Sequence, residues 1–224
     1  METLRTIEQR LQDDDRFQFR VRYSNIPPPT YRTHHLYHFL PRPGTEQAYQ
    51  AALDFVAGKG RHHFLTFVGP VGTGKTMLAL GIAWFWLDNT DSLVKYYQTE
   101  ALLDELRRGF HADTEEKQYN FDRVMKLIKD AGLLVIDDLG VEQSTPFARA
   151  KLDMIIDHRY LGRLPTVVTT NLSPAQLGER IADRLSEGVV AVIDAPSWRK
   201  VKSRTVNRNL EQTDGAKEGQ SDTD

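Results

Sequence analysis

The chain of 224 residues contains no cysteine. Disulfides and cysteine-ligated zinc or iron–sulfur sites are therefore excluded, and nothing in the composition points to an oxidising compartment. Long apolar runs are also missing, because the longest, residues 79–87, is far shorter than the roughly 20 residues of a transmembrane helix. The N-terminus carries charge with no apolar segment behind it, unlike a secretory signal peptide. We therefore expect a soluble, cytoplasmic protein that contacts no membrane.

An excess of charge of one sign is missing as well. Lysine and arginine total 29 and aspartate and glutamate total 31, which gives a formal net charge of −2. This balance excludes adhesion to nucleic acid through bulk charge, although it allows a local basic patch. Hydrophobic residues make up 40% of the chain, which is enough to build one sizeable core.

Strand-like and helix-like segments alternate through the middle of the chain. Short runs rich in β-branched and other apolar residues are separated by amphipathic segments. Such alternation is typical of a parallel sheet covered by helices on both faces. The expected strands are 64–68, 93–97, 133–136, 166–170 and 189–193, and the expected helices are 75–88, 99–109, 118–130, 146–161 and 174–186.

The two ends of the chain lack the alternation of strands and helices that marks this central α/β part. Helices are expected over residues 2–12 and 46–57. Between them, Pro27-Pro28-Pro29 predicts an extended link, because consecutive prolines disfavour the helical region. The resulting division is a short N-terminal segment and linker over 1–62, the central domain over 63–205, and a disordered polar tail over 206–224.

One motif in the central domain predicts phosphate binding. It comprises Gly69, Pro70, Val71, Gly72, Thr73, Gly74, Lys75 and Thr76, which match the P-loop at every required position. The glycines allow backbone N–H groups to surround phosphate oxygens, and the following helix directs its positive end at the same anion. Lys75 is placed for the β- and γ-phosphates, and Thr76 offers a hydroxyl to Mg²⁺. The motif therefore predicts a nucleotide and Mg²⁺ site.

Three polar residues end buried strands and are expected at the same edge of the sheet, where α/β proteins bind ligands. Asp137 suits the Mg²⁺ side of the site, directly or through water. Asp138 suits polarisation of the attacking water, with a cap on the following turn as the alternative. Asn171 suits orientation of water near the γ-phosphate if its strand lies between the other two, with an Asx turn as the alternative.

These segments together resemble a known family. Residues 69–76, 133–140, 170–171 and 177–185 are similar to AAA+ ATPases of the DnaC/IstB type, which include bacterial helicase loaders and transposition helper ATPases. The resemblance covers about residues 60–205. It implies a five-stranded parallel sheet of order 5-1-4-3-2 with no C-terminal helical lid domain, and ATP and Mg²⁺ as cofactors. It also maps the second sensor onto Arg199 and the arginine finger onto Arg184, which would act on a neighbouring subunit of a homo-oligomer. The alternative for Arg184 is pairing within its own helix, with Glu179, Asp183 and Glu187 as local partners.

The resemblance implies an ATP-hydrolysing, DNA-binding switch that acts on a partner protein. We expect a loader of a replicative DnaB-type helicase. The first alternative is a transposition helper that selects target DNA and activates a transposase, and the second is a nucleotide-dependent protein adaptor with little hydrolysis. Loader and helper share the same ATPase residues, so these motifs do not separate them.

A local signal for DNA ends the helix over 99–109. Arg107, Arg108 and Phe110 supply two cations and a ring, which can contact phosphate and stack on a base, preferably of single-stranded DNA. The alternative is a favourable placement of arginine at a helix C-terminus. A second basic stretch over 199–208 is either a phosphate track or a solvated chain end.

The histidines and tryptophans are interpreted as structural residues. Trp84 and Trp86 lie in an apolar helix, which favours the core over base stacking. Five histidines lack the spaced carboxylates or cysteines of a metal site, so we interpret them as solvated linker residues. These histidines are His34, His35, His38, His62 and His63.

Overall fold

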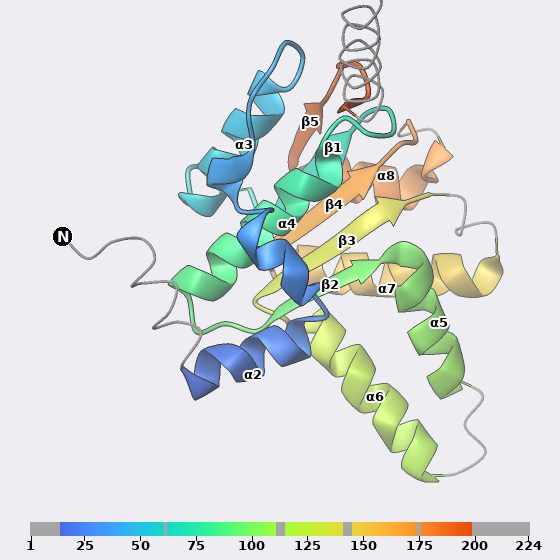
Figure 1. The fold of residues 1–224 in the computed structure, drawn as a ribbon. Coiled ribbons are helices and arrows are strands. Elements are labelled where there is room, and N and C mark those ends of the chain that lie inside the picture. The colour runs from blue at the N-terminus through green and yellow to red at the C-terminus, as the bar shows by residue number, and fades with distance from the viewer. Residues whose placement is uncertain (1–13, 61, 111–114, 141–144, 174–175, 199–224) are drawn as a thin grey trace, which may run out of the picture.

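The structure is a computed structural model that describes residues 14–60, 62–110, 115–140, 145–173 and 176–198, apart from the side chains of 108–110 and 115–120. Its centre is a parallel sheet of order β2-β3-β4-β1-β5 (Figure 1). The strands are β1 (Phe64–Val68), β2 (Val94–Gln98), β3 (Leu133–Leu139), β4 (Thr166–Thr170) and β5 (Val189–Val192). This arrangement confirms the expected α/β fold and the order 5-1-4-3-2.

Helices cover both faces of this sheet and bury two apolar clusters. Side chains of β3 divide between them, with Leu133 and Val135 in the first cluster and Leu134 and Ile136 in the second. A strand buried on both faces needs a continuous apolar run, which is what this segment has. The first cluster lies under α2 (Asp15–Ser24), α3 (Glu46–Val56) and α4 (Lys75–Asn89), and the second under α5 (Thr99–Phe110), α6 (Glu115–Lys129), α7 (Pro146–Leu161) and α8 (Glu179–Ser186).

The described part of the N-terminal segment packs against α4. Phe17 and Leu36 belong to the same apolar cluster as α4, and the indole N–H of Trp84 donates to the Thr30 hydroxyl at 2.9 Å. The core thus continues across residue 62, where the sequence suggested a domain boundary. The expected helix over 2–12 and the tail over 206–224 lie outside the described residues.

Two expectations for this segment are wrong. The three prolines do not form an extended link, because Pro28 begins a 3₁₀-helix, η1 (Pro28–Arg32). A proline fits the first helical position, since its fixed φ is compatible with a helix and the N–H that it lacks has no partner there. His35 is 5% exposed rather than solvated. It precedes a second 3₁₀-helix, η2 (Leu36–His38). The centroid of its ring lies 4.7 Å from the ring centroid of Tyr31, so packing between the two rings accounts for the burial of His35.

A buried arginine ties α6 and α7 to the start of β4. Arg159 is 0% exposed, and its guanidinium donates to the carbonyl oxygens of Lys129 and Ala131, both at 2.9 Å, and to the Thr166 hydroxyl at 2.8 Å. Burial lowers the pKa of Arg159 to about 9, which leaves the side chain charged at neutral pH. The carbonyl oxygens at the end of α6 are thereby satisfied inside the protein.

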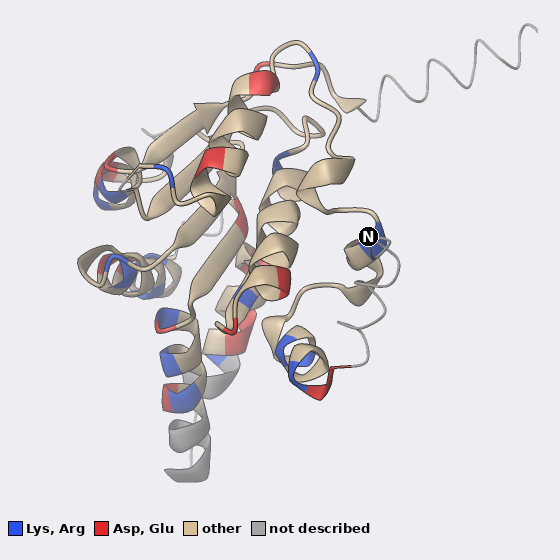
Figure 2. Cartoon of the chain, turned by 90° about the vertical axis from the view of Figure 1, so that its left-hand side faces the viewer, with Lys and Arg blue, Asp and Glu red and all other residues tan. Residues whose placement is uncertain are grey.

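Charges of both signs are interleaved over the helices on the side shown in Figure 2. This distribution agrees with the formal net charge of −2. Within the described ranges, every helix is too short or too polar to cross a membrane.

Candidate nucleotide-binding site

The P-loop connects β1 to α4 at the carboxyl edge of the sheet, and its glycines are required by both conformation and packing. Gly72 and Gly74 have φ of +79° and +109°, a region that side chains disfavour. A Cβ atom at Gly72 would lie 2.3 Å from the Ser197 hydroxyl oxygen, and one at Gly74 would lie 2.8 Å from the Phe39 ring. The backbone N–H of Trp198 also donates to the Gly72 carbonyl oxygen at 2.8 Å. Two distant segments therefore pack directly on the loop.

Lys75, in the first turn of α4, has a buried side chain surrounded by oxygens. Its ammonium group donates to the carbonyl oxygens of Gly69 at 2.7 Å and Pro70 at 2.8 Å, and to the amide oxygen of Asn171 at 2.6 Å. Burial lowers the pKa of Lys75, while the charges of Asp138 and Asp137 act in the opposite direction. The ammonium group thus lies against the P-loop, next to the position where the loop would hold phosphates.

Asp137 is 2% exposed and accepts hydrogen bonds at both carboxylate oxygens. Its Oδ1 accepts from the hydroxyls of Thr76 at 3.1 Å and Thr169 at 2.5 Å, and its Oδ2 accepts from the Tyr96 hydroxyl at 2.8 Å. Burial raises the pKa of Tyr96, so its hydroxyl keeps the proton that it donates. The Thr76 hydroxyl and the Asp137 carboxylate are the oxygen donors that Mg²⁺ prefers.

Asp138 lies inside β3 at an irregularity of the strand. The sequence suggested a strand ending at Ile136, but β3 continues to Leu139, and its register with β4 shifts between these two residues. Asp138 has φ of +58° and is exposed, while its backbone N–H donates to the Thr169 hydroxyl at 2.8 Å. A bulge of this kind re-aims a side chain, and here it turns the two adjacent carboxylates to different surroundings.

Asn171 connects the lysine to the exposed carboxylate. Its amide oxygen accepts from Lys75, and its amide nitrogen donates to Asp138 Oδ1 at 2.9 Å. The expected placement of β4 between β1 and β3 brings this residue into the gap. The structure therefore gathers Lys75, Thr76, Asp137, Asp138 and Asn171 at one edge, while their chemical roles stay predictions.

Four of these residues, Lys75, Thr76, Asp137 and Asp138, line a cleft of about 710 Å³, and Asn171 is connected to it through its hydrogen bond with Lys75. Its other wall consists of residues whose place at the site the sequence did not indicate, and for two of them, His34 and His38, the sequence suggested only solvated linker residues. They come from the N-terminal segment and from the end of the described chain, and include His34, His38, Phe39, Leu40 and Trp198. A phosphate-binding end beside a wall that carries several rings, with Thr33 and Arg42 among them, suits an organic phosphate with a flat heterocycle.

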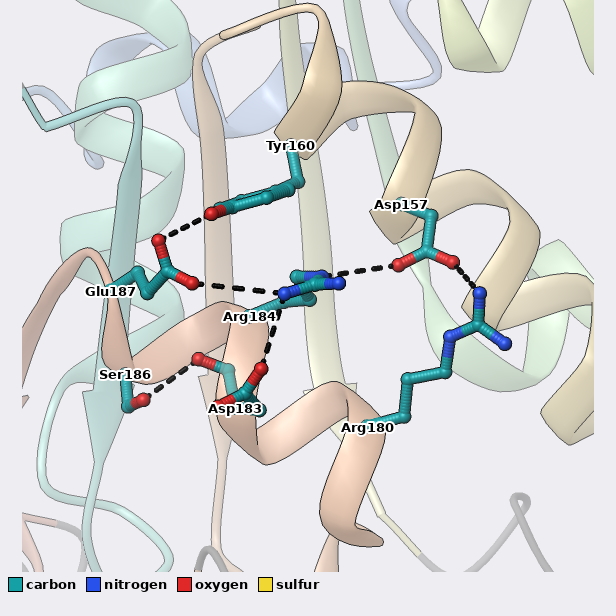
Figure 3. Close-up of polar contacts among 7 residues, drawn as sticks. All are labelled: Asp157, Tyr160, Arg180, Asp183, Arg184, Ser186 and Glu187. Atoms are coloured by element: carbon teal, nitrogen blue, oxygen red, sulfur yellow. Dashed lines mark hydrogen bonds and ion pairs between the residues drawn. The ribbon is translucent and has the colours of Figure 1, made fainter.

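The arginines of α8 lie apart from this cleft, since none of its described lining residues comes from that helix. Arg184 Nε donates to Asp157 at 3.3 Å, and its Nη1 donates to Asp183 at 3.1 Å (Figure 3). Arg180 also donates to Asp157. Their helix α8 packs on the second apolar cluster, whereas the helix α4 of Lys75 packs on the first.

The remaining candidates are only partly described. Arg107 donates to Asp104 at 2.8 Å within the same helix, and α5 ends at Phe110. The side chains of Arg108 and Phe110 lie outside the described residues, as do Arg199 and the basic stretch over 199–208. Their DNA and sensor roles stay predictions.

The sequence matches a known family along most of its length. The family of IstB-like ATP binding proteins matches residues 1–194. The replicative helicase loader DnaC of Escherichia coli is 30% identical over 129 residues, which cover 54% of this chain and 49% of that protein. The chromosomal replication initiator DnaA of Thermotoga maritima is 28% identical over 169 residues, covering 74% of this chain and 37% of that protein. The chain thus matches between a third and a half of the length of these relatives.

Solved structures agree with this match. A crystal structure of the DnaC helicase loader has a TM-score of 0.64 at 24% identity, covering 73% of this chain and 98% of that chain. A crystal structure of DnaI has a TM-score of 0.61 at 25% identity, covering 78% and 94%. AMPPCP-bound DnaA from Aquifex aeolicus has a TM-score of 0.65 at 17% identity, covering 80% and 55%. The fold is therefore an AAA+ core like that of DnaC.

The hydroxyl of Tyr96 yields the first prediction. Tyr96→Phe removes the donor to Asp137 Oδ2 and leaves that carboxylate less well oriented. We expect the Kd for a nucleotide with Mg²⁺ to rise about 10-fold, with little change in EDTA. Fluorescent-nucleotide titration measures both values. Tyr97→Phe, on the opposite face of β2, is the matched control. An equal loss in both variants, or a loss that persists in EDTA, would contradict a role on the metal side.

Proposed function

The chain belongs to the family of IstB-like ATP-binding proteins, AAA+ proteins related to DnaC, DnaI and DnaA, and on this premise we propose that it hydrolyses ATP with Mg²⁺. The contact of Asn171 with both Lys75 and Asp138 carries this proposal. Through it, Lys75, the proposed cation for the phosphates, and Asp138, the proposed carboxylate for water, lie close together at one edge of the sheet, beside Asp137, which supports this proposal.

Each residue has a separate part in the proposed reaction. Backbone N–H groups of the P-loop and the ammonium of Lys75 bind the β- and γ-phosphates. The ammonium exchanges the carbonyl oxygens of Gly69 and Pro70 for phosphate oxygens, because a charged acceptor forms the stronger hydrogen bond. Thr76 and Asp137 would hold Mg²⁺, which neutralises phosphate charge when it is bound. Asp138 accepts a hydrogen bond from water and orients its oxygen toward the γ-phosphorus. The water oxygen forms a bond to that phosphorus while the bond from phosphorus to the β–γ bridging oxygen breaks. One proton of the water passes through Asp138 to solvent, and ADP and hydrogen phosphate form.

Separate substitutions distinguish binding from hydrolysis. Lys75→Ala removes a contact to the ground-state phosphates, so we expect nucleotide binding to be lost. Asp138→Asn changes a group that acts mainly on water, so we expect ATP to bind with nearly unchanged affinity while turnover falls about 10²-fold or more. Nucleotide titration and phosphate release measure the two properties. Undiminished turnover in Asp138→Asn would show that another residue positions the water.

We propose that Arg184 completes the active site of a neighbouring subunit. The support is its position on α8, away from the lining of its own cleft, and its permanent charge. An arginine supplied by a neighbour accelerates phosphoryl transfer by about 10³–10⁵-fold. Hydrolysis would then require a homo-oligomer.

Mixing two inactive proteins tests this arrangement. The Asp138→Asn subunit keeps Arg184, the arginine finger, but cannot hydrolyse the ATP in its own site. The Arg184→Ala subunit keeps an intact site but lacks the arginine finger. Their mixture contains interfaces where an intact site faces an intact finger, so we expect turnover to return and to peak near equal proportions. A mixture that stays inactive although mixed assemblies form would place Arg184 within its own subunit or in a purely structural role.

The partner and the DNA are the finer part of the proposal. We propose a loader of a replicative helicase, in line with the E. coli relative. Single-stranded DNA is the proposed ligand of Arg107, Arg108 and Phe110, in line with a DnaA structure solved with AMPPCP and single-stranded DNA. A transposition helper is the second candidate, favoured by the family match. A neighbouring transposase gene would favour the helper, neighbouring replication or phage genes would favour the loader, and turnover indifferent to DNA would favour a protein adaptor.

A further inference from the structure

Arg184 lies in a cage of side chains from α7 and α8 (Figure 3). Asp157 Oδ1 accepts from its Nε at 3.3 Å, and the Tyr160 ring centroid lies 4.5 Å from its Cζ. Asp183 of the same helix accepts from Nη1 at 3.1 Å, and Glu187, the residue that follows α8, lies 3.7 Å from Nη1. The contacts among described residues engage Nε and Nη1 and leave Nη2 outside them.

Asp157 is the best placed of the three carboxylates to hold this guanidinium. Its side chain is 19% exposed, against 63% for Asp183 and 50% for Glu187. Water and salt weaken the two exposed pairs far more than the shielded one. The hydrogen bond that Arg184 donates to Asp157 is also the main cause that raises the pKa of Arg184. Tyr160 adds a flat surface for the guanidinium, and its hydroxyl donates to Glu187.

A carboxylate beside a catalytic cation would weaken the field that the cation exerts, and Arg180 offsets this effect. Arg180 donates to Asp157 Oδ2, while Arg184 bonds the other oxygen. The two arginines and Asp157 alone carry a net charge of +1. Asp183 and Glu187 pair with Nη1 and bring the whole group to −1, but both are at least half exposed, so water screens their charge more than that of Asp157. Asp157 thus holds Arg184 by Nε, and Nη2 stays outside the contacts among described residues.

We propose that Asp157 is the positioning residue of Arg184, which fixes the Nε edge of the guanidinium so that its outer edge meets the γ-phosphate bound by the neighbouring subunit. This inference rests on the proposed trans action of Arg184. Asp157 itself touches no substrate and acts through Arg184. Catalysis by a positioned group depends steeply on geometry, and a misplacement of about 1 Å can cost 10²-fold in rate.

The placement of Asp157→Ala in a mixed assembly of full-length chains tests the proposal. The starting, or parent, mixture contains two variants. The Asp138→Asn subunit is the finger donor, because it supplies Arg184, and the Arg184→Ala subunit is the site donor, because it supplies the intact ATP site. Adding Asp157→Ala to the finger donor should lower the recovered turnover about 10- to 100-fold, with the KM for ATP nearly unchanged. Adding it to the site donor should have no effect, because that subunit has no finger to position.

A matched control removes the same charge one helical turn earlier. Asp153 lies on α7 four residues before Asp157 and lines the neighbouring groove between α7 and α8, and among the described contacts it makes none with Arg184. Asp153→Ala in the finger donor should leave the recovered turnover unchanged. Alanine is the residue most compatible with a helix interior, so neither substitution should disturb α7.

The outcomes distinguish the positioning role of Asp157 from the trans action of Arg184 on which it rests. Equal losses from either placement of Asp157→Ala would show a structural role, and no loss from either would show that Arg184 needs no positioning by Asp157. Failure of the parent mixture to recover any turnover would overturn the trans mechanism and the positioning role with it. That failure is distinguishable because it appears with Asp157 intact.

Discussion

A buried ammonium group at the edge of a parallel sheet is the constraint on which the rest of the site depends. Lys75 is withdrawn from water, and its charge must be met by oxygens from several elements. Two come from the P-loop and the third from Asn171 at the end of β4. This arrangement works only because β4 lies between β1 and β3, so the strand order and the site chemistry depend on each other.

Asp137 and Asp138 show how one strand supplies two different carboxylates. The irregularity in β3 leaves Asp137 buried, with three hydroxyls donating to it, and turns Asp138 to an exposed position beside Asn171. A left-handed conformation at Asp138 costs on the order of 1–3 kcal/mol, which surrounding contacts must offset. The Thr169 hydroxyl serves both residues, because it donates to Asp137 and accepts from the Asp138 N–H.

The sequence predicted the elements that follow simple rules. The P-loop has a fixed pattern, and the buried strands show as apolar runs, so the motif, the α/β class and the gathering of Asp137 and Asn171 could be anticipated. Other features depend on contacts between distant segments. The second wall of the cleft, the burial of His35, the Tyr96 hydroxyl on Asp137 and the bulge at Asp138 arise from tertiary packing, and no local pattern marks them.

The most direct test of this account concerns Asn171 as the connection between Lys75 and Asp138. Asn171→Ala should bind ATP with nearly unchanged affinity, because the groups proposed to bind the phosphates, the P-loop N–H groups and the ammonium of Lys75, both remain. Single-turnover hydrolysis in the assembled protein should fall at least about 10-fold, because Asp138 loses the partner that orients it. An unchanged rate of hydrolysis in a variant that still binds ATP and assembles would contradict the account.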